Sequence, residues 1–321
     1  MDSRKVISVV TPCFNEEDSI EECYQAIKQV FDTQLPDYRV EHIFCDNAST
    51  DRTVELLTAI AERDPNVRII VNSRNFGILK NTYNGVLNAS GDAILLFMPV
   101  DLQDPPELIP AFVKHWESGY EIVYGIRAQR EEPFLLASAR KAYYRLLSRL
   151  TYVDYPANVG DFQLVDRQVL DAMKQIHDAQ PFMRLMTFDV GFRSIGVEYT
   201  WRARKHGVSR NHLIHMFDQG LNGIISFSNA PLRIALVAGF LVSALSLVYA
   251  VVVLALALLG LVHSQAGIPT VIVALFFFGG VQLFFLGMLG EYILAIYNQV
   301  RTRPLVVERK RINFGSGDES R

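Results

Sequence analysis

Two glycine-rich phosphate motifs are missing from this sequence. Its 321 residues contain neither Gly-x-Gly-x-x-Gly nor Gly-x-x-x-x-Gly-Lys-[Ser/Thr]. The first motif binds the pyrophosphate of a dinucleotide, and the second binds the phosphates of ATP or GTP. Without them, the sequence gives no support for a dehydrogenase or a P-loop NTPase.

Cysteine is scarce and the net charge is small. The three cysteines, Cys13, Cys23 and Cys45, are odd in number and show no Cys-x-x-Cys spacing. This pattern argues against a disulfide framework or a zinc site, and it fits a reducing compartment. The formal net charge of −3 gives no reason to expect nucleic acid as a partner.

Charge is absent from two long stretches near the C-terminal end. No Asp, Glu, Lys or Arg occurs from Ile234 to Val262 or from Ser264 to Gly290. A helix needs about 20 consecutive apolar residues to cross a bilayer. We therefore predict two transmembrane helices, at residues 231–262 and 268–296.

Basic residues give the expected orientation of these helices. Connector residues 263–267 carry no Lys or Arg, whereas both flanks are basic. By the positive-inside rule, both flanks are cytoplasmic. The N-terminal residues show no signal-peptide core. We therefore expect a multi-pass protein of the inner (cytoplasmic) membrane, with a catalytic domain at residues 1–210 and a tail at 297–321, both in the cytoplasm. The flanking basic residues are Arg202, Arg204, Lys205, Arg210, Arg233, Arg301, Arg303, Arg309, Lys310 and Arg311.

Two further segments are amphipathic. Residues 134–152 combine apolar side chains with four basic ones, and residues 211–230 lead directly to the first predicted span. A basic amphipathic helix can lie on an anionic bilayer surface, although a surface helix packed on a sheet shows the same pattern. The neighbouring spans favour interfacial helices.

Short β-rich runs alternate with helix-period segments through the first half of the chain. Continuous apolar strands are typical of a sheet covered on both faces, and strands separated by helices form parallel pairs. The sequence therefore predicts an α/β fold with a doubly wound, mostly parallel sheet. The expected strands are Val6–Thr11, Val40–Cys45, Val67–Val71, Ala93–Met98 and Ile122–Ile126, and the expected helices include Ser19–Phe31 and Thr53–Arg63.

The fourth expected strand leads into Asp101 and Gln103. With the two-residue alternation of a strand, the carboxylate and the carboxamide leave on the same side. They can then offer hard oxygen ligands to Mg²⁺ or Mn²⁺ and a diphosphate. For Asp104 we expect a structural role, as the cap of a helix that begins with Pro105 and Pro106.

Polar residues also follow the other expected strands. Pro12 and Glu16 end the first, Asp46 ends the second, and Asn75 and Gly77 come after the third. Taken singly, each is a turn or cap signal. Together with the pair after the fourth strand, they form a polar rim along the carboxyl edge of one sheet, the usual ligand position in open α/β folds.

These strand ends resemble those of the family-2 glycosyltransferases, which have the A-type nucleotide-sugar fold. Pro12–Glu16 matches that family's Pro-x-x-Asn-Glu, and Asp46–Asp51 matches its Asp-x-x-Ser-x-Asp. The resemblance covers nearly the whole chain. Asp101–Pro106, Gly160–Phe162, the basic stretch Arg202–Arg210 and the double-span end narrow it to the polyprenyl-phosphate glycosyltransferases, similar to dolichol-phosphate mannose synthase and bacterial undecaprenyl-phosphate glucosyltransferases.

The resemblance implies a role for each matching residue. Pro12, Glu16 and Asp46 would surround the nucleobase and ribose, and Asn75 and Gly77 would complete the nucleotide site.

The catalytic groups follow from the same resemblance. Asp101 and Gln103 would hold the metal. Asp161 would lie beside the donor sugar, as a hydrogen-bond acceptor or a base, with a turn residue after Gly160 as the structural alternative. With Arg204, these two aspartates form the expected catalytic set.

A lipid phosphate needs cationic positioning, because a phosphate monoester is largely ionised near neutral pH and needs little help from a base. Guanidinium groups offer fork-shaped, charge-assisted donation to it. For Arg140, attraction to lipid headgroups is an equal explanation. Tyr199 and Trp201, on one face of a further expected strand, line the sugar or lipid path or pack in the core. The residues expected at the acceptor phosphate are Arg127, Arg140, Arg204, Ser209 and Arg210.

One position departs from the family pattern. Pro99 stands where relatives usually have the first acidic residue of Asp-Ala-Asp. Asp101 and Gln103 suffice with the diphosphate, or metal affinity is reduced, or the protein is an inactive nucleotide-binding scaffold at the membrane.

The expected reaction is an inverting transfer of a hexose to a polyprenyl phosphate such as undecaprenyl phosphate at the cytoplasmic face. UDP-glucose is the first choice of donor, with GlcNAc, a modified arabinose or GDP-mannose as alternatives. The product would be a lipid-linked sugar donor for cell-envelope or O-antigen glycosylation. A processive synthase is less favoured, because the sequence lacks a Gln-x-x-Arg-Trp motif. Family members that form tetramers make a homo-oligomer the expectation.

Overall fold

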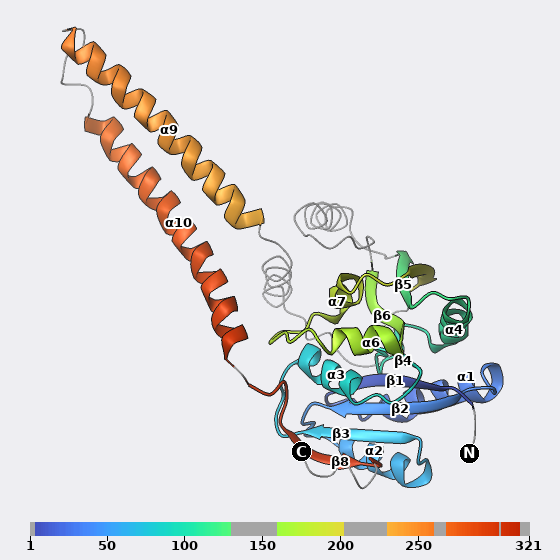
Figure 1. Ribbon diagram of the computed structural model, residues 1–321. Coiled ribbons are helices and arrows are strands. Elements are labelled where there is room, and N and C mark those ends of the chain that lie inside the picture. The colour runs from blue at the N-terminus through green and yellow to red at the C-terminus, as the bar shows by residue number, and fades with distance from the viewer. Residues whose placement is uncertain (1–3, 130–158, 202–229, 260–267, 302, 315–321) are drawn as a thin grey trace. The chain divides into compact units, whose positions relative to one another are not determined.

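The chain folds as two compact units (Figure 1). The computed structural model describes residues 4–129, 159–201, 230–259, 268–301 and 303–314. One unit combines Met1–Arg145, Val153–Asn211 and Thr302–Arg321, and the other combines Leu146–Tyr152 with His212–Arg301. The expected amphipathic segments 134–152 and 211–230 lie outside the described residues, except for Ala230, which begins the helix α9.

The first unit contains an eight-stranded sheet with the order β7-β5-β6-β4-β1-β2-β3-β8. Its parallel centre consists of β3, β2, β1 and β4. Strands β6 and β8 run antiparallel to their neighbours. The bounds are β1 Val6–Cys13, β2 Arg39–Asp46, β3 Val67–Asn72, β4 Ala93–Leu95, β5 Ile122–Gln129, β6 Val159–Asp166, β7 Ser194–Thr200 and β8 Glu308–Ile312.

The strand order reverses between β1 and β4. From β1 the chain continues outward through β2 and β3, whereas β4 lies on the other side of β1. This confirms the predicted α/β fold with a mostly parallel, doubly wound sheet. In such sheets a ligand site forms at the carboxyl ends of the strands, where the order reverses.

Helices cover both faces of the sheet, as Figure 1 shows. Val9 and Phe44 belong to the core that includes residues of α1, whereas their chain neighbours Val10 and Cys45 face Gly85 of α3. Because successive strand residues point to opposite faces, α1 and α3 lie on different sides. The bounds are α1 Ile20–Gln34, α2 Thr53–Arg63, α3 Ile78–Leu87, η1 Pro106–Leu108, α4 Ile109–Glu117, α6 Arg167–Met173 and α7 Met183–Asp189.

Gly85 allows α3 to approach the sheet closely. A Cβ atom at this position would collide with the Sγ atom of Cys45 and would come within 2.8 Å of Val10. Any larger residue would push α3 off the strands that carry the polar rim.

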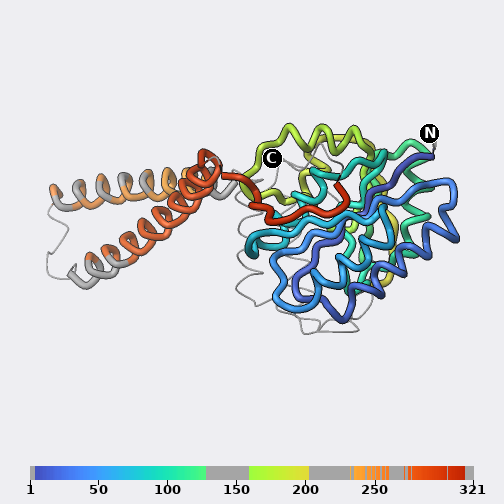
Figure 2. The backbone as a smooth tube through the Cα atoms, turned by 90° about the horizontal axis from the view of Figure 1, so that it is seen from below, coloured from blue at the N-terminus to red at the C-terminus, as the bar shows by residue number. Residues whose placement is uncertain are grey.

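Strand β8 was not expected from the sequence, which identified residues 297–321 only as a tail. It pairs antiparallel with β3 and closes that edge of the sheet. Figure 2 shows this C-terminal segment lying along the sheet. Glu308–Ile312 is mostly charged, so the sequence does not show there the alternation of apolar and polar residues that would indicate a strand. Charged side chains are typical of an edge strand.

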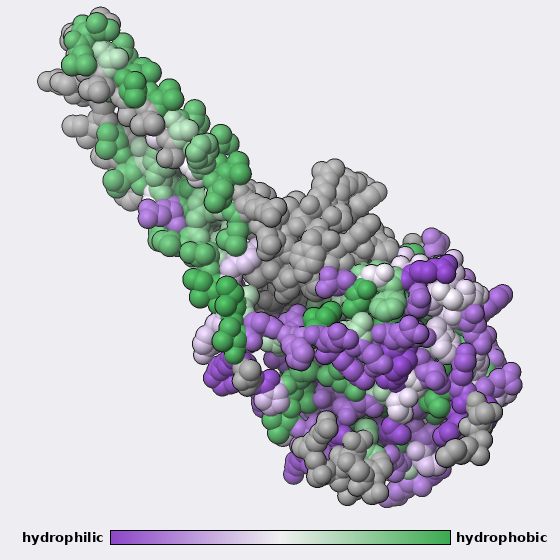
Figure 3. Space-filling model, viewed as in Figure 1, coloured by the Kyte–Doolittle hydropathy of each residue, from purple (hydrophilic) through white to green (hydrophobic). Residues whose placement is uncertain are grey.

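The second unit contains two long apolar helices, α9 (Ala230–Leu258) and α10 (Ile268–Val300). They lie side by side in Figures 1 and 2. Ala235–Val253 and Phe277–Val300 are long and apolar enough to cross a membrane. Neither window is buried in the described structure, unlike the core helix of a soluble protein. In Figure 3 the described surface of these helices is mostly apolar, whereas the described surface of the first unit is mostly polar. These are candidate membrane spans.

Candidate functional site

The carboxyl ends of the central strands bring the predicted polar rim together. Cys13 at the end of β1 is in register with Asp46 at the end of β2. The backbone N–H of Asn47 donates to the carbonyl of Cys13 over 3.0 Å. Pro12 is a buried residue of β1 beside Cys45.

Two loops at this edge hold each other through hydrogen bonds from backbone N–H groups to side-chain oxygens. Asn15 has a left-handed backbone, with φ 55°. Its N–H donates to Ser49 Oγ over 2.9 Å, and its Oδ1 accepts the N–H of Thr50 over 2.8 Å. The N–H of Glu16 donates to Thr53 Oγ1 over 2.9 Å. The half-buried side chain of Glu16 is therefore carried on a fixed backbone.

Asp46 is fully buried and already has partners. Its carboxylate accepts the Ser49 N–H over 3.0 Å and also the Ser49 hydroxyl. Burial raises the pKa of Asp46, and the bonds from Ser49 offset this only in part. A carboxylate has about four lone-pair positions, so a further donor such as a nucleobase N–H can still be accepted.

A network of four asparagines, which we call the amide half, supports the loop after β3. Asn47 Nδ2 donates to Asn75 Oδ1 over 2.9 Å, and Asn75 Oδ1 also accepts the N–H of Gly77 over 2.9 Å. Asn72 Nδ2 donates to Asn81 Oδ1 over 2.7 Å. Within the described part of the chain, the buried Asn72 Oδ1 has no hydrogen-bond partner. The network fixes the backbone at Asn75 and Gly77, two predicted nucleotide residues.

The turn that carries Asp101 and Gln103 differs from the predicted one. Strand β4 ends at Leu95, so the expected strand alternation does not reach these residues. A turn closes instead when the Leu102 N–H donates to the Pro99 carbonyl over 3.1 Å, and Leu102 has a left-handed φ of 52°.

Asp101 and Gln103 nevertheless remain neighbours. Asp101 Oδ1 accepts the backbone N–H of Gln103 over 3.2 Å, and both residues are half-buried. Among the described residues, no group of three or more His, Cys, Asp or Glu is arranged to hold a metal ion. One carboxylate and one carboxamide nevertheless fit a Mg²⁺ or Mn²⁺ ion whose shell is completed by substrate phosphates and water.

Asp104 does not cap a helix, so that prediction was wrong. The following short helix shows no side-chain cap. Asp104 is only 1% exposed, and both its oxygens lie 3.2 Å from Arg127 Nη2. The Tyr199 hydroxyl donates to Asp104 and accepts from Arg127 Nε over 3.1 Å. Arg127 also lies over the ring of Trp201, at 5.1 Å. A buried charge is costly without a partner. Asp104 therefore pairs with Arg127 instead of capping the helix.

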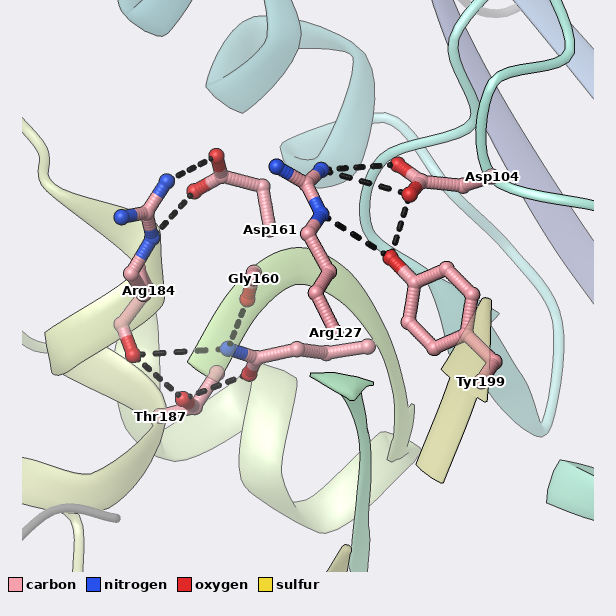
Figure 4. Close-up of polar contacts among 8 residues, drawn as sticks. Asp104, Arg127, Gly160, Asp161, Arg184, Thr187 and Tyr199 are labelled. Atoms are coloured by element: carbon pink, nitrogen blue, oxygen red, sulfur yellow. Dashed lines mark hydrogen bonds and ion pairs between the residues drawn. The ribbon is translucent and has the colours of Figure 1, made fainter. Parts of the chain in front are cut away.

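Asp161 lies at the same edge of the sheet, in an ion pair. The Leu96 N–H donates to the Gln163 carbonyl over 2.9 Å, and this antiparallel register carries Asp161 past the end of β4. Arg184 of α7 donates to both carboxylate oxygens, over 3.1 and 2.5 Å (Figure 4). Burial alone raises the pKa of Asp161, but Arg184 and Arg127 outweigh it and leave the pKa below its usual value.

Asp104, Arg127, Asp161 and Arg184 form what we call the charged half of the site. The sequence signalled Arg127 and Asp161 but missed the partners that hold them. Arg184 stands between the buried Met183 and Leu185, and a cation among apolar residues indicates a buried ion pair. The neighbouring sequence, however, does not identify the partner. Arg140, Arg204, Ser209 and Arg210 lie outside the described residues.

Comparisons with known proteins agree with this architecture. The model of glycosyl transferase family 2 matches residues 8–173. An uncharacterized glycosyltransferase of Bacillus subtilis is 40% identical over 94% of this chain and 93% of its own length.

Two further relatives have more specific names. The SfII prophage-derived bactoprenol glucosyl transferase of Shigella flexneri is 34% identical, over 95% of this chain and 97% of its own. The prophage bactoprenol glucosyl transferase homolog of Escherichia coli is 33% identical, over 95% and 98%. With a family model that matches half of the chain and relatives that match nearly all of it, this protein belongs to glycosyl transferase family 2 and is a glycosyltransferase.

Proposed function

We propose that this enzyme transfers a hexose from a nucleotide sugar to a polyprenyl phosphate such as undecaprenyl phosphate. The observation that carries the proposal is the charged half of the site, where Arg127 pairs with Asp104, three residues after Asp101, and also interacts with Asp161. Relatives named bactoprenol glucosyl transferases that match nearly the full length support a polyprenyl acceptor. They also favour UDP-glucose over UDP-GlcNAc, a modified arabinose donor or GDP-mannose.

The donor nucleotide is proposed to lie over β1, β2 and β3. Glu16, Asp46, Asn75 and Gly77 are the residues there that offer hydrogen bonds to base and ribose, with Pro12 shaping the backbone beneath. Asp101 and Gln103 would hold a divalent metal. When bound, Mg²⁺ or Mn²⁺ supplies positive charge to the departing diphosphate.

The acceptor phosphate is proposed to approach Arg127. This guanidinium is held by Asp104 and Tyr199, so its position is fixed before the lipid arrives. A phosphate monoester is already largely ionised near pH 7, and Asp161 is paired with a cation. A single displacement without strong general-base help therefore suits these residues, and it would invert the anomeric centre. Arg140, Arg204, Ser209 and Arg210 are proposed as further acceptor contacts, with Arg204 in the catalytic set.

The enzyme is proposed to be a multi-pass protein of the inner membrane with its sheet unit in the cytoplasm. Single cysteines at Ser264 and Ser316, in a background without Cys13, Cys23 and Cys45, test this orientation. An impermeant thiol reagent should label intact cells at position 264 and leave position 316 unlabelled. The reverse pattern would contradict the orientation.

A direct assay tests the reaction itself. Full-length protein in nanodiscs is mixed with polyprenyl phosphate, Mn²⁺ and each nucleotide sugar in turn, and lipid products are identified by mass spectrometry. A lipid-linked hexose from UDP-glucose, with inverted configuration by NMR, is the expected result. Release of UDP that does not depend on the lipid would contradict the proposed acceptor.

Pro99 favours one alternative, an inactive scaffold that binds nucleotide at the membrane. Its side chain offers no ligand at a position where the family usually has an aspartate. A protein that binds UDP with Mn²⁺ but forms no product with any donor would support the scaffold.

If active, the enzyme would supply a lipid-linked sugar for cell-envelope or O-antigen glycosylation. We also propose that it acts as a homo-oligomer, a tetramer by family resemblance.

A further inference from the structure

Arg184 meets Asp161 in a two-point, fork-shaped contact. Nε lies 3.1 Å from Oδ1, and Nη2 lies 2.5 Å from Oδ2. Both side chains are about three-quarters covered, with 23% and 25% exposed. The fork fixes the plane of the carboxylate as well as its charge, because a guanidinium is rigid and planar.

A buried amide and a buried hydroxyl also connect the two backbones that carry this pair. Figure 4 shows Gly160, Arg184 and Thr187, which take part in these contacts. Gln163 Nε2 donates to the carbonyl of Gly160 over 3.0 Å and lies 3.4 Å from the carbonyl of Arg184. Thr187 Oγ1 donates to Gln163 Oε1 over 2.8 Å. Gln163 and Thr187 are both 0% exposed.

This arrangement links β6, which carries Asp161, to α7, which carries Arg184. A buried amide is costly unless its donors and acceptors are satisfied, and here the partners are the backbone beside Asp161 and the first turn of α7. Gln163 and Thr187 therefore set the distance between β6 and α7. Neither side chain contacts the Asp161 carboxylate or the Arg184 guanidinium.

We propose that Arg184 is a positioning residue that holds the Asp161 carboxylate in one orientation toward the donor sugar, and that Gln163 and Thr187 fix Arg184 for this role. The inference deepens the proposed function, because it rests on Asp161 acting at the sugar. The charged groups around Asp161 are Arg184 from α7, Arg127 from β5 and Asp104 from the loop after β4.

Loss of the guanidinium has a defined consequence. Arg184 lowers the pKa of Asp161, so Arg184→Gln should raise it. The carboxylate then becomes protonated at higher pH, and the acidic limb of the kcat profile should move upward. Misplacement of a reacting group by about 1 Å costs roughly 10²-fold in rate, so kcat should fall by up to about 10²-fold, with KM for the donor little changed.

The test compares full-length variants in nanodiscs by kcat, KM and pH profile. Arg184→Lys should restore the pH limb but not the full kcat, because an ammonium keeps the charge and loses the fork. Thr187→Val, which keeps the side-chain shape, should lower kcat in the same direction. Arg63→Gln breaks an exposed ion pair between α2 and α1, in which Arg63 Nη2 contacts both carboxylate oxygens of Glu21, and it is the matched control, with unchanged kinetics.

A double-mutant cycle separates this inference from the role of Asp161. If Arg184 acts through Asp161, Asp161→Asn with Arg184→Gln should be no slower than Asp161→Asn alone. An active Asp161→Asn would contradict the proposed role of Asp161 itself. An inactive Asp161→Asn, together with Arg184→Lys and Thr187→Val that keep wild-type kcat and pH profile, would overturn the positioning inference alone. That outcome does not depend on Arg184→Gln, so it remains decisive if this variant fails to fold.

Discussion

The two halves of the carboxyl edge are held together by different chemistry. The amide half, at the ends of β2 and β3, uses neutral side chains that both donate and accept. The charged half, around β5 and β6, uses two arginine–aspartate pairs. A nucleobase and a ribose offer neutral donors and acceptors, whereas phosphate and developing charge require cations. This chemical difference matches the roles proposed above, donor recognition for the amide half and transfer for the charged half.

The charged half is neutral as a unit. Two guanidinium groups face two carboxylates, so an incoming phosphate meets cations that already have partners. Such pairs keep the arginines in place in the empty site and avoid an unpaired buried charge.

The largest effect is expected from Asp104→Asn. This change leaves Arg127 in a mostly buried position without its counter-ion, and the free energy of unfolding should fall by about 3 kcal/mol. Urea denaturation of the full-length protein in detergent measures it. Glu21→Gln, in the exposed pair with Arg63, is the control and should cost less than about 1 kcal/mol. Equal losses of stability for Asp104→Asn and Glu21→Gln would mean that the ion pair of the charged half stabilises the protein no more than an exposed surface pair does.

Asp101→Ala should reduce turnover roughly 10²–10³-fold while the fold remains stable, because a contact to the leaving diphosphate is lost. Gln103→Ala should act in the same direction. Rates across a titration of Mn²⁺ provide the measurement. Pro99→Asp is the companion variant and should lower the metal concentration for half-maximal rate. Near-normal turnover of Asp101→Ala would remove the metal assignment from this turn.

His42 tests whether charge is excluded from the buried part of β2, the strand that leads to the amide half. It lies buried on β2, with Nε2 2.9 Å from Thr11 Oγ1. Burial lowers its pKa to about 3, whereas the unfolded chain takes up the proton near pH 6.5. Stability should therefore be complete above pH 6.5 and decline as the pH falls toward 3.

The expected loss between pH 6.5 and 5.5 is about 1 kcal/mol, because half of the unfolded chains already carry the proton at pH 6.5. Urea denaturation at several pH values measures it. His42→Gln should remove this slope, and His115→Gln should keep it. A slope that survives His42→Gln would assign it to other groups.

The smallest effect is expected from Asn75→Ala on the donor side. One hydrogen bond contributes about 0.5–1.5 kcal/mol, so KM for the nucleotide sugar should rise a few-fold. The free energy of unfolding should fall by no more than about 1–3 kcal/mol, because Asn75 itself is exposed but Asn47 Nδ2 and the Gly77 N–H lose their acceptor. Steady-state kinetics with donor and acceptor varied separately decide this. A larger rise in KM for the lipid than for the donor would mean that the Asn75 loop serves the acceptor, contrary to the proposed donor role.

Much of the fold follows from local sequence patterns. The expected helix Thr53–Arg63 matches α2 at both ends, and Val6–Thr11 falls short of β1 by two residues. Apolar runs and their period depend on neighbours in sequence, which explains this accuracy. Strand β4 is shorter than Ala93–Met98 because its regular ladders with β1 and β6 end at Leu95. Beyond this point only single hydrogen bonds continue, from Leu96 to Gln163 and from Met98 to Val10.

The partners within the site could not be predicted in the same way. Asp104 meets Tyr199 across 95 positions of the sequence, and Asp161 meets Arg184 across 23. Local signals could identify Asp104 only as a helix cap. The polar rim itself was predictable, because carboxyl ends of parallel strands meet at one edge, but its division into an amide half and a charged half depends on contacts between distant segments.

The division is tested most directly by Asn47→Ala and Arg127→Lys in one pair of assays. Isothermal titration of UDP with Mn²⁺ measures the donor side, and initial rates against polyprenyl phosphate measure the acceptor side. Asn47→Ala should weaken UDP binding and leave the acceptor KM close to normal, because Asn47 supports the Asn75 loop. Arg127→Lys should keep UDP binding and raise the acceptor KM, since an ammonium lacks the guanidinium fork. Equal losses in both assays for both variants would contradict a divided site.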